Sequence, residues 1–157
     1  MVVDVVHHIW DALDVNNQRK LVMGLDMYLV GDKHVGGSLA SCVEPVPSED
    51  GKPIQSISID LGYWRKHRKL HGYIVDNFAG GEDECQKIYL SAPDLRKIAE
   101  ALCTHDLPTT EGFFFGSDEI DTDQKKHGKE YAAWFEDAAR WLERGDWRLS
   151  VYYRASW

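Results

Sequence analysis

GYWRKHRKLHGYIVDNF, residues 62–78, has the spacing of an amphipathic helix and follows directly on an alternating, strand-like segment. At about 100° per residue, Trp64, His67 and His71 share one side of this helix with the aliphatic residues. Arg65 takes the opposite, polar side. We therefore expect a helix over the whole stretch, with two histidines in its apolar face.

Two strands are predicted ahead of this helix. Apolar residues alternate with polar ones over 23–30, MGLDMYLV, and again over 57–61, ISIDL, as in a half-buried strand. The segment between them, residues 31–53, is rich in glycine and proline and is predicted to be a long loop or flap.

The C-terminal half adds elements of both kinds. Ser91 and Asp94 form an approximate capping box that predicts the start of a helix with Pro93 in its first turn. The other predicted elements are a short strand at 85–90, a short strand or aromatic loop at 112–116, a helix at 130–144 and a strand at 147–154. This order predicts an α+β fold of about three helices on a mainly antiparallel or mixed sheet of four to five strands.

The length of 157 residues fits one domain with a sizeable core. The first 22 residues differ in pattern from the rest, and Met23 opens the first predicted strand. We interpret residues 1–22 as an N-terminal extension outside the core and residues 23–157 as a single α+β domain.

The composition narrows the class of protein. A net charge of -8 argues against direct nucleic-acid binding, which needs Lys and Arg against phosphates. The three cysteines are widely spaced and form no CxxC pair, which is typical of a reduced, cytoplasmic protein. Since no apolar run approaches about 18 residues, we expect no membrane span.

Sequence motifs of common enzyme classes are absent. The chain contains no GxGxxG, GxxxxGK[ST], HExxH or GxSxG pattern, so the sequence leans against an enzyme and implies no cofactor. His67 and His71 are four residues apart, as in a two-histidine metal site, but nothing in the spacing selects a third ligand. We expect no metal site and regard buried, hydrogen-bonded imidazoles as the better interpretation.

The candidate ligand-binding residues are Trp64, Arg65, His71 and Asn77, together with Thr109 and Thr110. An indole can stack on a planar ring, a guanidinium can hold a phosphate or carboxylate, and a neutral imidazole can donate a hydrogen bond or act as a general base. The threonines belong to a glycine-bounded segment, LPTTEGFFFG at 107–116, which can cradle an anion or simply form a turn before a core strand.

Several motifs together resemble a family of small uncharacterised bacteriophage and prophage proteins. They are MGLDMYL at 23–29, YWRK at 63–66 followed by His71, LPTTEGFFFG at 107–116 and the terminal SW. The resemblance covers residues 23–157 and implies a phage or prophage origin, with no mechanism attached. His71 matches the family pattern and His67 does not, which weakens the metal-pair interpretation further.

Our leading hypothesis is a small phage-type accessory protein in the host-cell cytoplasm that binds either a host protein, counteracting a host system, or a small anionic, nucleotide-like ligand. One alternative is a nucleotide or phosphoester hydrolase that uses His71 as acid or base. The other is a structural or assembly protein, in which the six tryptophans supply a homo-oligomer interface.

Overall fold

The structure, a computed structural model, describes residues 24–35, 50–108 and 121–157. Its elements are β1 (Asp26–His34), β2 (Ser56–Arg65), α1 (Arg68–Phe78), β3 (Ile88–Leu90), α2 (Ala92–Thr104), α3 (Asp121–Leu142) and β4 (Leu149–Ser156). Three helices and a four-stranded antiparallel sheet confirm the predicted α+β class. None of the described helices is long and apolar enough to cross a bilayer.

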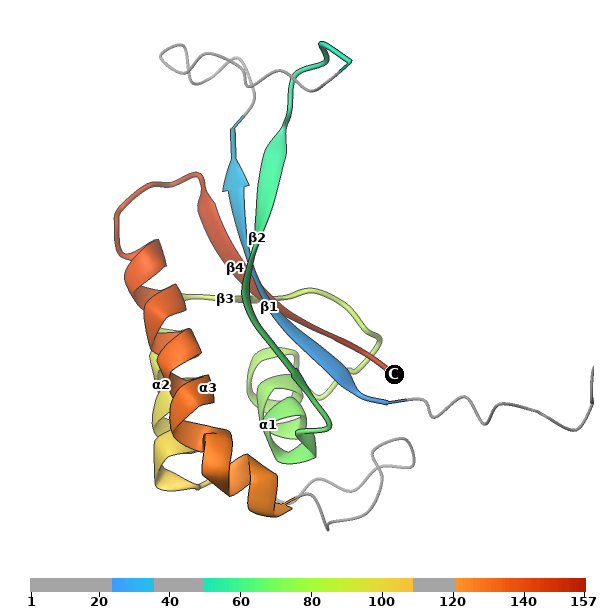
Figure 1. The fold of residues 1–157 in the computed structure, drawn as a ribbon, viewed down its shortest axis with the longest axis vertical. Coiled ribbons are helices and arrows are strands. Elements are labelled where there is room, and N and C mark those ends of the chain that lie inside the picture. The colour runs from blue at the N-terminus through green and yellow to red at the C-terminus, as the bar shows by residue number, and fades with distance from the viewer. Residues whose placement is uncertain (1–23, 36–49, 109–120) are drawn as a thin grey trace, which may run out of the picture.

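The strands follow the order β2-β1-β4-β3, and every pair is antiparallel. The helices gather on one face of this sheet, with α2 and α3 packed side by side (Figure 1). Met27 and Leu29 of β1 lie opposite Ala155 and Tyr153 of β4, and all four are buried beneath the helices. The alternation predicted for this strand thus points one set of side chains into the core.

The prediction of a helix over all of residues 62–78 is wrong at its N-terminal end. Residues up to Arg65 belong to β2, and α1 begins only at Arg68. The segment pairs with β1, where Tyr63 lies opposite Tyr28 and Trp64 opposite Met27. The spacing of apolar residues at 62–67 fits both the helix period and the strand period. These residues join the sheet because they pair with β1.

The chain turns from β2 into α1 at Lys66, whose φ of 58° lies in the left-handed region. His67 then caps the helix, because its Nδ1 accepts a hydrogen bond from the Leu70 amide at 3.3 Å. The helix therefore starts with an imidazole where Ser or Asp is more usual.

The C-terminal elements agree with prediction except at their ends. The capping box at Ser91 and Asp94 is present in α2. The strand predicted at 85–90 is shorter in the structure, where only Ile88–Leu90 form β3. Cys85 has a left-handed φ of 56°, which interrupts an extended chain. The helix predicted at 130–144 starts earlier and stops at Leu142, whereas β4 is shifted two residues along from 147–154.

The loop predicted at 31–53 is wrong at its start, because β1 continues to His34 on pairing with β2 and β4. Most of its remainder, residues 36–49, lies outside the described residues. The extension at 1–22 and the aromatic segment at 112–116 lie entirely outside them. These interpretations stay predictions.

Candidate functional site

Trp64 and Arg65, predicted to share a ligand, lie on opposite faces of β2. The Trp64 side chain is 3% exposed and packs among aromatic rings, with centroid distances of 5.6 Å to Phe135 and 5.9 Å to Tyr131. Arg65 Nε pairs with Asp26 Oδ1 at 2.6 Å on the face that carries no helix. Successive residues of a strand point to opposite sides, so these two side chains cannot contact one small ligand together.

His71 belongs to a buried hydrogen-bonded chain. Its side chain is 2% exposed; Nδ1 lies 2.7 Å from the Tyr153 hydroxyl and Nε2 lies 2.8 Å from Asp83 Oδ2. In a neutral imidazole the consistent assignment has Tyr153 O–H donating to Nδ1 and Nε2–H donating to the carboxylate.

Burial first, and the nearby Asp83 charge second, raise the pKa of Tyr153 well above 10.0, which keeps the hydroxyl protonated and able to donate. Both ring nitrogens of His71 are therefore used inside the protein. The arrangement ties α1 to β4 and to the segment that precedes β3.

His67 is buried as well, and its imidazole contacts Tyr131 at a centroid distance of 5.9 Å. Within the residues that the structure describes, no three His, Cys, Asp or Glu side chains lie close enough together to hold a metal ion. The pair at positions 67 and 71 thus contributes a helix cap and a core hydrogen-bond chain.

Asn77 lies at the exposed end of α1, away from the other candidates. Its Nδ2 donates to the Tyr73 carbonyl at 2.8 Å, and its Oδ1 accepts from Lys97 Nζ at 3.4 Å. Thr109 and Thr110 lie outside the described residues. The predicted ligand-binding residues that are described do not converge on one cleft.

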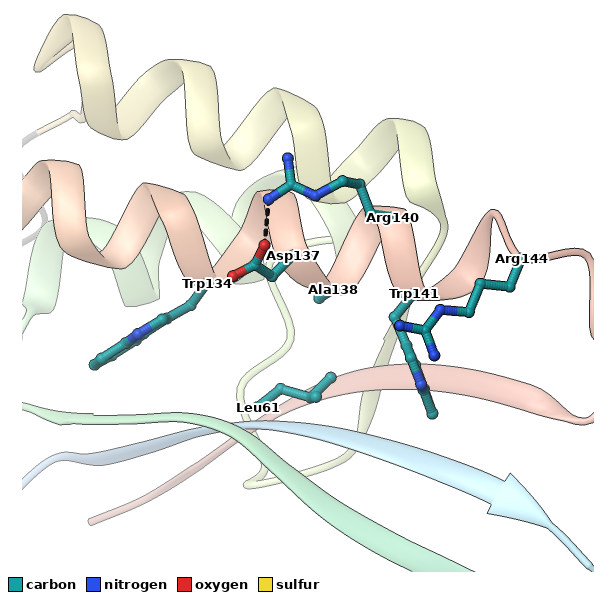
Figure 2. Close-up of a pocket in the computed structure, with 7 residues that line it drawn as sticks. All are labelled: Leu61, Trp134, Asp137, Ala138, Arg140, Trp141 and Arg144. Atoms are coloured by element: carbon teal, nitrogen blue, oxygen red, sulfur yellow. Dashed lines mark hydrogen bonds and ion pairs between the residues drawn. The ribbon is translucent and has the colours of Figure 1, made fainter.

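A different group of residues forms a groove of about 360 Å³ between α3 and β2 (Figure 2). Trp134 and Trp141 extend from α3 toward the sheet, and Leu61 of β2 points up between them. Seven residues separate the indoles along the helix, which spaces their attachment points by about 10 Å. The full lining is Leu61, Trp134, Asp137, Ala138, Arg140, Trp141 and Arg144.

Two glycines of the sheet make room for these indoles. A Cβ on Gly31 would lie 2.7 Å from Trp141 Cζ3, and a Cβ on Gly62 would lie 2.8 Å from Trp134 Cε3. The backbone of β1 and β2 therefore supports the edge of each ring directly. Any larger residue at either position would push a wall of the groove outward.

The two arginines of the groove differ in whether their guanidinium groups are paired. Arg140 turns back along α3 and pairs with the Asp137 carboxylate (Figure 2). Arg144, just beyond the end of α3, has no ion pair or side-chain hydrogen bond within the described part of the chain. The groove thus combines two half-buried indoles with a guanidinium whose donors are not used by any described residue.

A second depression of about 320 Å³ lies between α1 and α2. It contains Lys97 together with the carboxylates of Glu100 and Asp106, so it presents both charges. Burial, followed by the Asp106 and Glu100 charges, raises the pKa of the Tyr73 phenol that lines it. This mixed surface favours no class of ligand.

The sequence alone does not predict the groove, because the aromatic residues of α3 have the spacing of an ordinary core-facing helix. The available signal was a pair of tryptophans seven residues apart with Ala138 between them, together with Arg140 and Arg144 on either side of the second tryptophan. A small residue between two large ones on a helix face leaves a gap that a bare hydrophobicity pattern does not reveal.

Comparison with protein families, with curated proteins and with solved structures gave no match to this chain. The groove therefore has to be interpreted from its own chemistry.

Proposed function

We propose that this protein is a binding protein and that its groove between α3 and β2 takes a small anionic ligand with a planar ring, such as a nucleotide. The observation that carries the proposal is the pairing of Trp134 and Trp141 with the available guanidinium of Arg144 in one groove. On the resemblance of the sequence motifs we also propose a phage or prophage origin, with the host-cell cytoplasm as the place of action.

The chemistry of each wall supports this ligand class. Indole faces attract planar rings, and a stacked base contributes about 1–3 kcal/mol. A guanidinium holds a phosphate or carboxylate by two parallel hydrogen bonds, which a lysine cannot do. A ligand with only a ring or only an anionic group would use half of the groove.

Because the net charge is -8, we propose a small ligand with one anionic group and not a nucleic-acid strand. One exposed guanidinium suffices for one phosphate group, whereas a nucleic-acid strand needs a continuous basic track. Asp137 neutralises Arg140, so the groove lacks such a track.

The test is a titration of tryptophan fluorescence with the four ribonucleoside monophosphates, with adenosine and with ribose 5-phosphate. We expect at least one monophosphate to quench the emission saturably and to bind about tenfold more tightly than adenosine or ribose 5-phosphate. Arg144→Gln is expected to weaken that binding about tenfold, since it removes a charge-assisted contact.

Arg154→Gln is the matched control, because Arg154 is also exposed but lies over the Tyr28 ring on the sheet face that carries no helix. Its binding curve should overlay that of the unmodified protein. Absence of saturable binding by all four monophosphates, or equal loss in the two arginine variants, would contradict the proposed function.

A further inference from the structure

β2 is a long edge strand whose outer side is open. The strand order places β2 and β3 at the two edges of the sheet, and the described residues place no strand on the far side of β2. β3 has only 3 residues, whereas β2 has 10. An edge strand presents a row of unpaired N–H and C=O groups with which another chain can pair. A short edge strand such as β3 offers few of these groups, whereas β2 offers many.

The exposed part of this edge is the segment Ser56–Asp60, SISID. Its end projects with β1 beyond the helices (Figure 1). Ile57 and Ile59 are 40% and 38% exposed and alternate with serine, so both point to the face of the sheet that carries the helices. An exposed edge strand with apolar side chains is a site at which another chain can add a strand.

The usual means of protecting an edge are missing from this segment. It contains no proline, lysine or arginine, and Asp60 is its single charged residue. The irregularity in the pairing with β1 comes only after Asp60, where Leu61 is the extra residue. A bulge bends the strand, so a regular partner can extend along Ser56–Asp60 and stops there.

The segment is complementary to itself in antiparallel register. With a twofold axis at Ser58, Ile57 of one copy lies opposite Ile59 of the other, and Ser56 lies opposite Asp60. Both isoleucine pairs then lie on the helix-bearing face, and no like charges meet. Cross-strand pairs of β-branched residues stabilise a sheet, and like charges directly opposite would destabilise it.

We propose that Ser56–Asp60 pairs with the same segment of a second copy, joining the two sheets into one continuous eight-stranded sheet. The antiparallel twofold pairing keeps the helices of both copies on the same face. Leu61, which lines the groove between α3 and β2, follows the paired segment directly, so the second copy borders that groove. The inference rests on the strand edge and is independent of what the groove binds.

Sedimentation equilibrium of the full chain tests the proposal. We expect a monomer–dimer equilibrium above the chain mass of 18.0 kDa. The dissociation constant should be about 1–100 µM, because a single strand pair is at the small end of protein interfaces. The double variant Ile57→Lys/Ile59→Lys places lysines opposite lysines and should weaken association at least about tenfold.

Tyr89→Lys is the matched control, since Tyr89 is 61% exposed on the other edge strand. It should leave the association unchanged. Circular dichroism should show that the variants are folded, because substitutions at exposed positions usually change stability little.

Cysteine cross-linking tests the register itself, in a chain whose three native cysteines are replaced by serine. Ser58→Cys lies on the proposed axis and should form an intermolecular disulfide at least about tenfold faster than Asp60→Cys, because only residues directly opposite come within bonding range. A monomer at about 200 µM, a dimer unaffected by the lysine pair, or equal cross-linking at both positions would overturn the proposal.

Discussion

At the scale of single residues, the hydrogen bonds of His71 to Tyr153 and Asp83 explain why the apolar face of α1 contains a buried imidazole. His71→Ala should lower the free energy of unfolding by about 2–4 kcal/mol, because it leaves a cavity and removes the partners of Tyr153 and Asp83. Urea unfolding at neutral pH measures this loss.

His127→Ala is the control, since that imidazole is partly exposed and pairs with the exposed Glu130. Its effect should stay below about 0.5 kcal/mol. Equal stability of the two variants would mean that the His71 chain contributes nothing to the fold.

Tyr153→Phe should change the pH dependence of stability at alkaline pH. Because burial raises the pKa of Tyr153 above its value of 10.0 in an unfolded chain, the folded state keeps its proton where the unfolded state loses it. The stability of the unmodified protein must therefore fall as the pH rises above about 10.

The phenylalanine variant loses the hydrogen bond to His71, about 1 kcal/mol at neutral pH, but lacks this alkaline decline. Unfolding curves between about pH 8 and pH 11 should therefore converge, whereas Tyr89→Phe at an exposed position should track the unmodified protein. Parallel curves for Tyr153→Phe would contradict a buried, protonated Tyr153.

At the scale of elements, the contact between α3 and the sheet depends on glycine. Gly31→Ala brings a methyl group to 2.7 Å from Trp141 Cζ3 and should cost about 1–3 kcal/mol of unfolding free energy. The variant should also shift the tryptophan emission, because the indole has to move.

The double variant Gly31→Ala/Trp141→Leu distinguishes this contact from a general intolerance of the strand to alanine. Since the two residues touch, the double variant should lose less than the sum of the single losses. Additive losses measured by urea unfolding would show that Trp141 does not lie against Gly31.

Elements were predictable where their signals are local. The capping box at Ser91 fixes the start of α2 within four residues of sequence, and the alternation around Met27 fixes the buried face of β1. The start of α1 was not predictable, because residues 62–67 suit a helix face and a strand face alike. Pairing with a strand more than thirty residues earlier decides between them.

At the scale of the whole molecule, the α+β class followed from the order of elements, whereas the groove did not. Trp134 and Trp141 form part of a stripe that looks like any core-facing helix. What makes their side a groove is the pair of glycines opposite, which come from β1 and β2, far away in the sequence. Such a site depends on which strands lie beneath the helix, and this arrangement cannot be predicted from a single sequence.

The most direct test of the groove is a nuclear magnetic resonance titration that follows the indole N–H signals of the six tryptophans. Each signal is assigned by a Trp→Phe variant, and the added ligands are the four ribonucleoside monophosphates. The account predicts that the Trp134 and Trp141 signals shift along one saturable curve, while that of Trp64, buried in the core, stays in place. Shifts confined to other tryptophans, or no saturable shift with any of the four, would contradict a ligand site between α3 and β2.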